Sequence, residues 1–222
     1  MDKFAFDISA VIINYQTPDL TRSAVQSFRA FYPMLPLLLI DNGSKDSSAA
    51  VLQECKAGFP QATEVILNQV NRFHGPAMHQ ALMHIQTRYV LFLDSDCEVR
   101  VNGIIERMVE TANNNERGYA VGKKTHMNKR GFDVSERPES IPYIRPICML
   151  LRREFYRTLP PFQHHGAPCL KNMRAAVDQG YLLSDFPIFD YITHKGRGTA
   201  SRFGYGLGIR GKIDYILNKL GL

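Results

Sequence analysis

The first hundred residues alternate short apolar runs with helix-forming segments, and this alternation constrains the fold more than any other feature. The apolar runs, each interpreted as a buried strand, cover residues 8–14, 36–40, 64–67 and 89–93. Helix signals follow the first run: Thr17 can cap a helix, Pro18 suits its first turn and Asp19 favours the positive end of its dipole. Such alternation predicts an α/β fold, with βαβ units and a mainly parallel central sheet flanked by helices.

A single domain is expected because no linker divides the chain of 222 residues. Helices are expected at about residues 17–32, 46–56, 76–87, 103–115, 152–158 and 169–179. Later strands are expected at residues 119–121, 147–151 and 190–194. Residues 123–140 are polar and basic, which predicts a loop, and Gly180 is expected to end the helix that precedes it.

Polar clusters follow three of the apolar runs, at the points where the strands should end. They are Asn14-Tyr15-Gln16, Asp41-Asn42-Gly43-Ser44 and Asp94-Ser95-Asp96. Ligands of open parallel sheets bind beyond the carboxyl ends of the strands. The sequence therefore predicts one ligand site that is built from these three clusters.

Two of these clusters carry carboxylates with distinct expected uses. Asp94 and Asp96 are one residue apart at a strand end, so both can meet one divalent cation, directly or through water. Hard oxygen ligands suit Mg²⁺ or Mn²⁺, and such an ion neutralises a diphosphate. A solvated acidic turn is the alternative. Asp41 can accept hydrogen bonds from a base N–H or ribose hydroxyls, or it can simply cap the next helix in a tight turn.

The order of the segments NYQTPD, LLLI–DNGS and YVLFLDSD resembles the nucleotide-sugar-binding half of the GT-A glycosyltransferases, specifically the family-two group. The resemblance covers about residues 8–100 and continues more loosely to about residue 195. It implies a GT-A, Rossmann-like fold in which Asp41 contacts the uracil or ribose, and Asn14 and Tyr15 pack against the base.

The same resemblance assigns the second carboxylate cluster to the metal and the diphosphate. It implies that Asp94 and Asp96 bind the metal, the ribose and the diphosphate, with Ser95 on the donor and Asp94 also among the catalytic candidates. The family motif N-x-G-F-G-x-A resembles residues 71–77, and Arg72 is a candidate nucleotide or phosphate contact. This chain departs from that motif at Phe73-His74, where Gly-Phe is usual, so a different local backbone is expected.

The catalytic base is the main departure from the family. Residues 147–155 resemble its acceptor-side stretch, after which an acidic pair normally supplies the base, but residues 162–170 contain no acid. An inverting transfer needs a base with a pKa near neutrality, and imidazole titrates there. His165 is therefore the first candidate and His164 the second, although both can be ordinary loop histidines. Weaker candidates are Asp185 and Asp190.

The late strand ends at His194, where the resemblance implies an extra metal ligand. Imidazole supplements carboxylates well for Mn²⁺. Lys195 and Arg197 follow in a glycine-rich stretch and are expected to contact the diphosphate of the donor. The alternative is a surface loop whose charges are incidental.

Charge is distributed unevenly along the chain, which carries a formal net charge of +6. Residues 1–122 contain 10 Lys/Arg and 13 Asp/Glu, whereas residues 123–222 contain 17 and 8. We assign residues 1–100 to donor binding, residues 101–200 to the acceptor, and residues 201–222 to a basic amphipathic tail. The tail could rest on an anionic membrane, or pack on its own domain or on a partner subunit.

The expected location is the cytoplasm, with the inner face of the membrane as the alternative. No apolar run reaches the roughly 20 residues that span a bilayer, and the first residues carry acids where a signal peptide needs basic residues.

The predicted function is a metal-dependent transfer of a sugar from a nucleotide diphosphate sugar, with UDP preferred, to a hydroxyl acceptor. The acceptor can be a carbohydrate, a lipid-linked sugar or a protein. Polysaccharide, lipopolysaccharide or another glycoconjugate would be the product. One alternative is a relative that binds nucleotide sugars without turnover. A phosphatase that uses its two aspartates is less favoured because Cys97-Glu98 follow them, and nucleic acid is not an expected partner because no aromatic stacking motif accompanies the basic residues.

Overall fold

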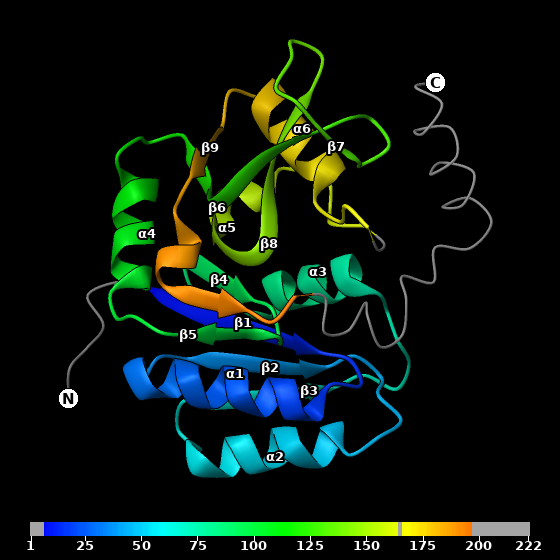
Figure 1. The fold of residues 1–222 in the computed structure, drawn as a ribbon, viewed down its shortest axis with the longest axis vertical. Coiled ribbons are helices and arrows are strands. Elements are labelled where there is room, and N and C mark those ends of the chain that lie inside the picture. The colour runs from blue at the N-terminus through cyan, green and yellow to red at the C-terminus, as the bar shows by residue number, and fades with distance from the viewer. Residues whose placement is uncertain (1–6, 164–165, 197–222) are drawn as a thin grey trace.

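A mixed eight-stranded sheet forms the centre of the molecule (Figure 1). The structure is a computed structural model that describes residues 7–163 and 166–196. The order of the sheet is β3-β2-β1-β4-β8-β6-β7, and β9 pairs with β6. These strands are β1 (Ile8–Asn14), β2 (Leu37–Asp41), β3 (Thr63–Leu67), β4 (Tyr89–Leu93), β6 (Gly118–Met127), β7 (Asp133–Val134), β8 (Ile141–Arg152) and β9 (Leu182–Asp185).

Parallel pairing holds the first-half strands together, as the alternating pattern predicts. β1 pairs in parallel with both β2 and β4, and β2 pairs in parallel with β3. The second half adds β8 antiparallel to β4, and β6 antiparallel to β8. The expected α/β fold is therefore confirmed, with antiparallel strands on one side of a mostly parallel arrangement.

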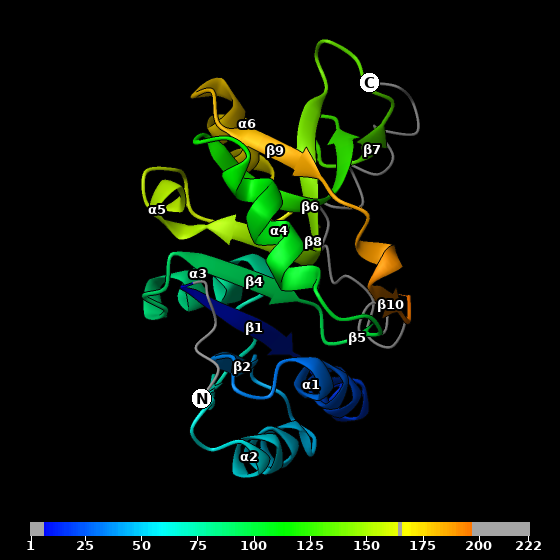
Figure 2. The same cartoon turned by 90° about the vertical axis from the view of Figure 1, so that its left-hand side faces the viewer.

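Helices cover both faces of the sheet (Figures 1 and 2). The helices α1, α2 and α4 pack with one set of alternating strand side chains, which includes Ala10 and Ile12. The helices α3 and α6 pack with the other set, which includes Val11. Successive strand residues point to opposite faces, so apolar strands such as β1 build both cores at once. The helices are α1 (Pro18–Phe31), α2 (Ser48–Gly58), α3 (His74–His84), α4 (Ile104–Asn113), α5 (Arg153–Tyr156) and α6 (Leu170–Asp178).

The loop expected over residues 123–140 is partly wrong. Residues 123–127 continue β6, and Asp133–Val134 forms the short strand β7 beside it. The strand expected at residues 147–151 also begins earlier, at Ile141, where it pairs with Met127. Antiparallel strands can carry polar side chains on a solvated face, so a search for apolar runs misses them.

A second, two-stranded sheet joins the middle of the chain to its later part. It pairs β5 (Cys97–Val99) with β10 (Ile192–His194) in antiparallel register. The sequence predicts a strand at residues 190–194, but a 3₁₀ turn, η1 (Ile188–Asp190), takes the first of these positions. The strand β5 is not predicted because only three residues form it. Gly180 follows α6 with φ +78°, as expected for a residue that ends a helix.

No helix in the described ranges is long and apolar enough to cross a bilayer. The tail of residues 201–222, with its proposed amphipathic stripe, lies outside the described residues.

Candidate active site

The carboxyl ends of β1, β2 and β4 meet at one edge of the sheet, and the three polar clusters meet there with them. Asn14 is the register partner of Asp41 across β1 and β2. The Asn14 Nδ2 donates to Asp41 Oδ1 at 2.8 Å. Ser95 Oγ, in the cluster after β4, lies 3.4 Å from Thr17 Oγ1, which belongs to the first cluster's turn. The three polar clusters are therefore brought together as one contiguous group.

Asn14 is buried and hydrogen-bonds to other protein groups, whereas the sequence analysis expected it to contact the base of a ligand. Its side chain is fully buried. Its Oδ1 accepts from Thr21 Oγ1 at 2.7 Å and from Thr17 Oγ1 at 3.2 Å, while Nδ2 holds Asp41 and also reaches Ser44 Oγ at 3.2 Å. Both ends of the amide are thus used by protein groups, so Asn14 joins β2 to the start of α1. Tyr15, its neighbour, is half-buried.

The Asp41 carboxylate is held in a fixed orientation. Ser44 donates to it twice, from Oγ to Oδ1 at 2.6 Å and from the backbone N–H to Oδ2 at 3.0 Å. With the bond from Asn14, Oδ1 accepts two hydrogen bonds and Oδ2 accepts one. Asp41 therefore stabilises its own turn and does not cap the next helix, α2, which begins at Ser48, and Oδ2 has room in its lone pairs for a further donor.

A loop after β3 packs closely on the Asp41 turn. Gly43 has φ +79°, and a Cβ on it would lie 2.3 Å from the carbonyl carbon of Val70. Asn42 binds the same loop, since its Oδ1 accepts from the Arg72 backbone N–H at 3.1 Å and its Nδ2 donates to Asn71 Oδ1 at 3.1 Å. Arg72 itself is exposed. The turn and the loop therefore form one unit beside Asp41.

Asp96 and His194 come together through the β5–β10 pairing. His194 is the register partner of Cys97, and its Nε2 lies 3.2 Å from Asp96 Oδ1. The backbone N–H of Lys195 also donates to the Asp96 carbonyl at 3.0 Å. The hydrogen bond to Asp96 raises the pKa of His194, against the opposing effect of burial. Asp96 is buried, so this pair is a preformed feature of the fold.

Asp94 interacts electrostatically with both members of this pair. Burial is the main cause that raises the pKa of Asp94 to about 8, and the negative charge of Asp96 adds to it. His194 acts in the opposite direction. The side chain nevertheless keeps 27% of its surface exposed, so it faces the site rather than the core. A cation placed here would relieve the repulsion between the two carboxylates.

The donor set fits a hard divalent cation. Side-chain ligand atoms of Asp96, His194 and Cys97 all lie within 4.8 Å of one another. The Cys97 thiol is fully buried, donates to the Ile147 carbonyl at 3.6 Å, and has its pKa raised far above the ordinary value by burial. It is therefore a core thiol, and the carboxylate and imidazole that remain are ligands suited to Mn²⁺ or Mg²⁺.

His74 is a further candidate site residue, which the sequence analysis did not propose. It begins α3, and its Nε2 lies 3.8 Å from Asp94 Oδ1. The next residue, Gly75, has the carbonyl oxygen of Gln163 only 2.4 Å from where a Cβ would be, so the chain around Gln163 packs directly on this helix start. The departure from the family motif at Phe73-His74 was the one signal for it in the sequence.

His164 and His165, the predicted bases, lie outside the described residues, as does Arg197. Lys195 is described, and its Nζ forms an ion pair with Glu98. Asp185 accepts from the Lys124 backbone N–H at 2.7 Å, which ties β9 to β6. Asp190 lies in η1.

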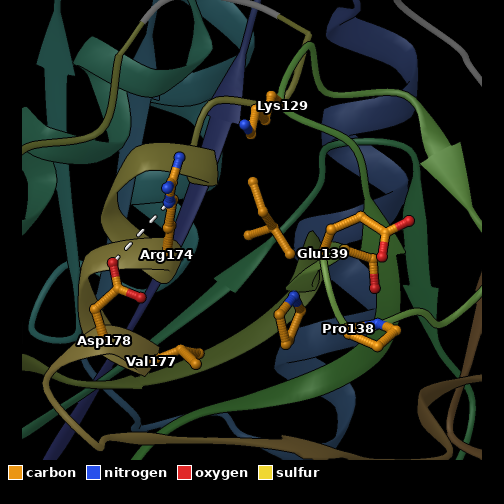
Figure 3. A pocket seen from close by; sticks show the side chains of 9 residues that line it. Lys129, Pro138, Glu139, Arg174, Val177 and Asp178 are labelled. Carbon is orange, nitrogen blue, oxygen red and sulfur yellow. Dashed lines mark ion pairs between the residues drawn. The ribbon is translucent and has the colours of Figure 1, made fainter.

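A pocket of about 370 Å³ opens elsewhere, between α6 and the segments that flank β7 and β8 (Figure 3). Lys129, Glu139 and the ion pair of Arg174 with Asp178 line it, together with apolar side chains such as Val177. None of the predicted site residues in the described ranges lines this pocket.

Comparisons with solved structures support the fold. GalNAc-T7, solved with UDP, GalNAc and Mn²⁺, has a TM-score of 0.70 at 14% identity, with 87% of this chain and 44% of that chain covered. The mannosyltransferase PcManGT from Pyrobaculum calidifontis, solved with GDP-Man and Mn²⁺, has a TM-score of 0.66 at 14% identity, with coverages of 83% and 56%. Glucosyl-3-phosphoglycerate synthase from Mycobacterium tuberculosis, solved with Mn²⁺, UDP and its product, has a TM-score of 0.58 at 15% identity, with coverages of 98% and 81%.

This chain thus spans about half the length of the first two of these proteins. No curated protein matches it significantly. The model of the family described as "Glycosyl transferase family 2" matches residues 9–179, which is most of the chain. The chain belongs to glycosyl transferase family 2 and has the GT-A fold.

Proposed function

We propose that this protein transfers a sugar from a nucleotide diphosphate sugar, with UDP as the first choice of nucleotide, to a hydroxyl acceptor in glycoconjugate synthesis. One observation carries the proposal: the Asp41 turn and the Asp94–Asp96 cluster follow strands that end at the same edge of the main sheet, and the second sheet brings His194 to Asp96 there. This edge is where ligands of open parallel sheets bind. Family membership supports the reaction class, and the solved relatives contain UDP or GDP-Man.

The nucleotide end of the donor is assigned to the Asp41 turn. Asp41 Oδ2 is oriented by the Ser44 N–H and would accept from the base N–H or a ribose hydroxyl. We assign Asn14 to holding this carboxylate, since its amide is buried and bonded to the protein at both ends. Tyr15 and the exposed Arg72 stand beside the turn and are proposed to contact the base and the phosphates.

The diphosphate end is assigned to Asp96, His194 and Asp94. These residues would hold Mn²⁺ or Mg²⁺, and such an ion supplies charge neutralisation for the departing diphosphate. Ser95 Oγ, close to Thr17 Oγ1, joins this group to the nucleotide end. Lys195 is proposed to contribute positive charge towards the diphosphate, together with Arg197. Electrostatic stabilisation of the leaving group is expected to be the largest catalytic effect.

The transfer itself is proposed to invert the anomeric carbon. A base takes the proton of the acceptor hydroxyl, the acceptor oxygen forms a bond to that carbon, and the bond to the diphosphate oxygen breaks. His165, with His164 second, stays the proposed base. The packing of Gln163 on Gly75 supports this assignment. Gln163 immediately precedes His164 in the chain, and Gly75 follows His74, which approaches Asp94.

A donor screen tests the proposed function. Thermal unfolding is measured with UDP-, GDP- and TDP-sugars, each with and without Mn²⁺. We expect at least one nucleotide sugar to raise the melting temperature in a Mn²⁺-dependent way, because a ligand that binds only the folded state stabilises it. If no nucleotide produces a metal-dependent rise, the proposal is wrong.

A catalytically inactive binder is the second candidate, and the missing acidic pair at residues 162–170 favours it. Release of UDP from the stabilising UDP-sugar, measured with Mn²⁺ and candidate acceptors, separates the two.

We place the protein in the cytoplasm, and liposome flotation with and without residues 205–222 tests attachment to an anionic membrane.

A further inference from the structure

Phe73 has a backbone conformation that side chains normally avoid. Its φ is +65° and its ψ is 165°, a region occupied almost only by glycine. Gln16 is the other non-glycine residue with a positive φ in the described part of the chain, and it also lies at the site, where its N–H donates to Ser44 Oγ at 2.9 Å. Backbone strain of this kind concentrates at functional sites.

The loop imposes this conformation whatever side chain the residue carries. The Phe73 N–H donates to Asn71 Oδ1 at 2.7 Å, and the Phe73 carbonyl accepts from Asn42 Nδ2 at 3.3 Å. The same carbonyl accepts from the Ala77 N–H at 3.2 Å and so starts α3. Glycine would make all of these bonds without strain, and glycine is the usual residue of the family motif that these residues resemble.

Packing of the Phe73 ring against the described residues does not offset the cost of this backbone strain. It is 50% exposed and belongs to neither of the two buried apolar clusters. The backbone of Phe73 therefore carries a cost in strain, and its half-exposed ring adds little stability through burial. A ligand that covers the ring would explain why it is there.

The position of Phe73 indicates which part of a ligand it meets. Arg72, on one side, has its backbone bound to Asn42 in the Asp41 turn. His74, on the other side, has Nε2 at 3.8 Å from Asp94 Oδ1. Phe73 therefore lies next to the residue that approaches Asp94, on the side of the site assigned to the diphosphate, and the donor sugar is bonded to the outer phosphate of that diphosphate.

We propose that the Phe73 ring is a stacking platform for the pyranose ring of the donor, an inference that rests on the proposed function. The C–H groups on one face of a pyranose carry partial positive charge, and the face of an aromatic ring is negative. Such a contact would select for the presence of the sugar and leave the nucleoside diphosphate unaffected. It would also orient the anomeric carbon.

The test compares Phe73→Gly and Phe73→Tyr with the wild type by isothermal titration calorimetry in Mn²⁺. The ligands are UDP, GDP and the nucleotide sugar that stabilises the wild type most. We expect Phe73→Gly to bind that nucleotide sugar about tenfold more weakly and the matching nucleoside diphosphate unchanged, and Phe73→Tyr to retain both affinities. Val70→Ala, an exposed apolar change in the same loop, should retain both as well.

A ligand-free melting curve provides the second readout. Phe73→Gly should melt at or above the wild-type temperature, because it relieves strain and removes no side chain of the two buried apolar clusters. A clear fall in melting temperature would show that the ring packs on the protein, and the proposal would be wrong. Equal weakening of nucleotide and nucleotide sugar, or no weakening of either, would also overturn it. If the wild type binds no nucleotide sugar at all, the proposed function has failed first and this inference fails with it.

Discussion

The Nε2 atom of His194 lies 3.2 Å from Oδ1 of Asp96, although the two residues belong to distant parts of the chain. The antiparallel pairing of β5 with β10 places them there, with Lys195 bonded to the Asp96 carbonyl just beyond. The pair supplies two of the three residues, Asp94, Asp96 and His194, that are expected to hold a divalent cation.

Removing either partner of this pair should weaken metal binding. We expect His194→Ala and Asp96→Asn each to reduce Mn²⁺ affinity in the presence of UDP by at least about tenfold, because even outer-shell partners of metal ligands contribute about 10- to 100-fold. Titration of Mn²⁺ followed by electron paramagnetic resonance measures the effect.

His84→Ala is the matched control for this change. His84 also pairs with a carboxylate, since its Nε2 lies 2.7 Å from Glu64 Oε1, but the pair is exposed and removed from the site. Its loss should leave Mn²⁺ affinity unchanged. A His194→Ala variant with wild-type affinity would exclude this histidine from the metal site.

Asn14→Ala should lower both stability and donor affinity. It removes the bonds to Asp41 and Thr21 from a fully buried position, so we expect a loss of about 2–3 kcal/mol in the free energy of unfolding. UDP should bind more weakly because Asp41 loses a positioning partner. Urea denaturation and calorimetry give the two values. Normal stability with weak UDP binding would instead point to direct contact between Asn14 and the nucleotide.

Gly43→Ala should disrupt the loop beside Asp41. The new Cβ would lie 2.3 Å from the Val70 carbonyl carbon, and φ +79° adds strain, so we expect a loss of about 3 kcal/mol or more together with weaker UDP binding. Gly103→Ala is the control, because Gly103 has φ +86° with no atom within 4 Å of the added Cβ. It should lose only about 1 kcal/mol and bind UDP normally. Equal losses would show that the close approach of Val70 is unimportant.

His165→Ala should reduce turnover while donor binding is retained. General base catalysis contributes about 10²- to 10⁴-fold, so the rate under saturating donor should fall within that range. His164→Ala should have a smaller effect. The rate is measured as UDP release, and donor affinity by calorimetry. Full turnover by the His165→Ala variant would remove His165 from the proposed role.

Most of the donor half could be predicted because its signals are local. The apolar runs place β1, β2 and β4 almost at their observed bounds, and parallel strands end at a common edge, so Asp41 and Asp94 were expected at the same edge of the sheet. The extension of β6 over residues 123–127 was missed because those residues are stabilised by pairing with β8, and isolated polar sequence does not reveal a partner. His74 was missed because its departure from the family motif does not reveal that its ring approaches Asp94, which belongs to another strand end.

The sequence by itself determined the α/β class, the strand ends that carry polar residues and the resemblance that implies a sugar transferase, since periodicity and short motifs encode these. Only the tertiary structure decided that His194 reaches Asp96, that the buried Asn14 amide donates a hydrogen bond to Asp41, and that Phe73 has a glycine-like backbone conformation. Each of these depends on where distant segments pack, and a contact between distant segments leaves no periodic trace in either one.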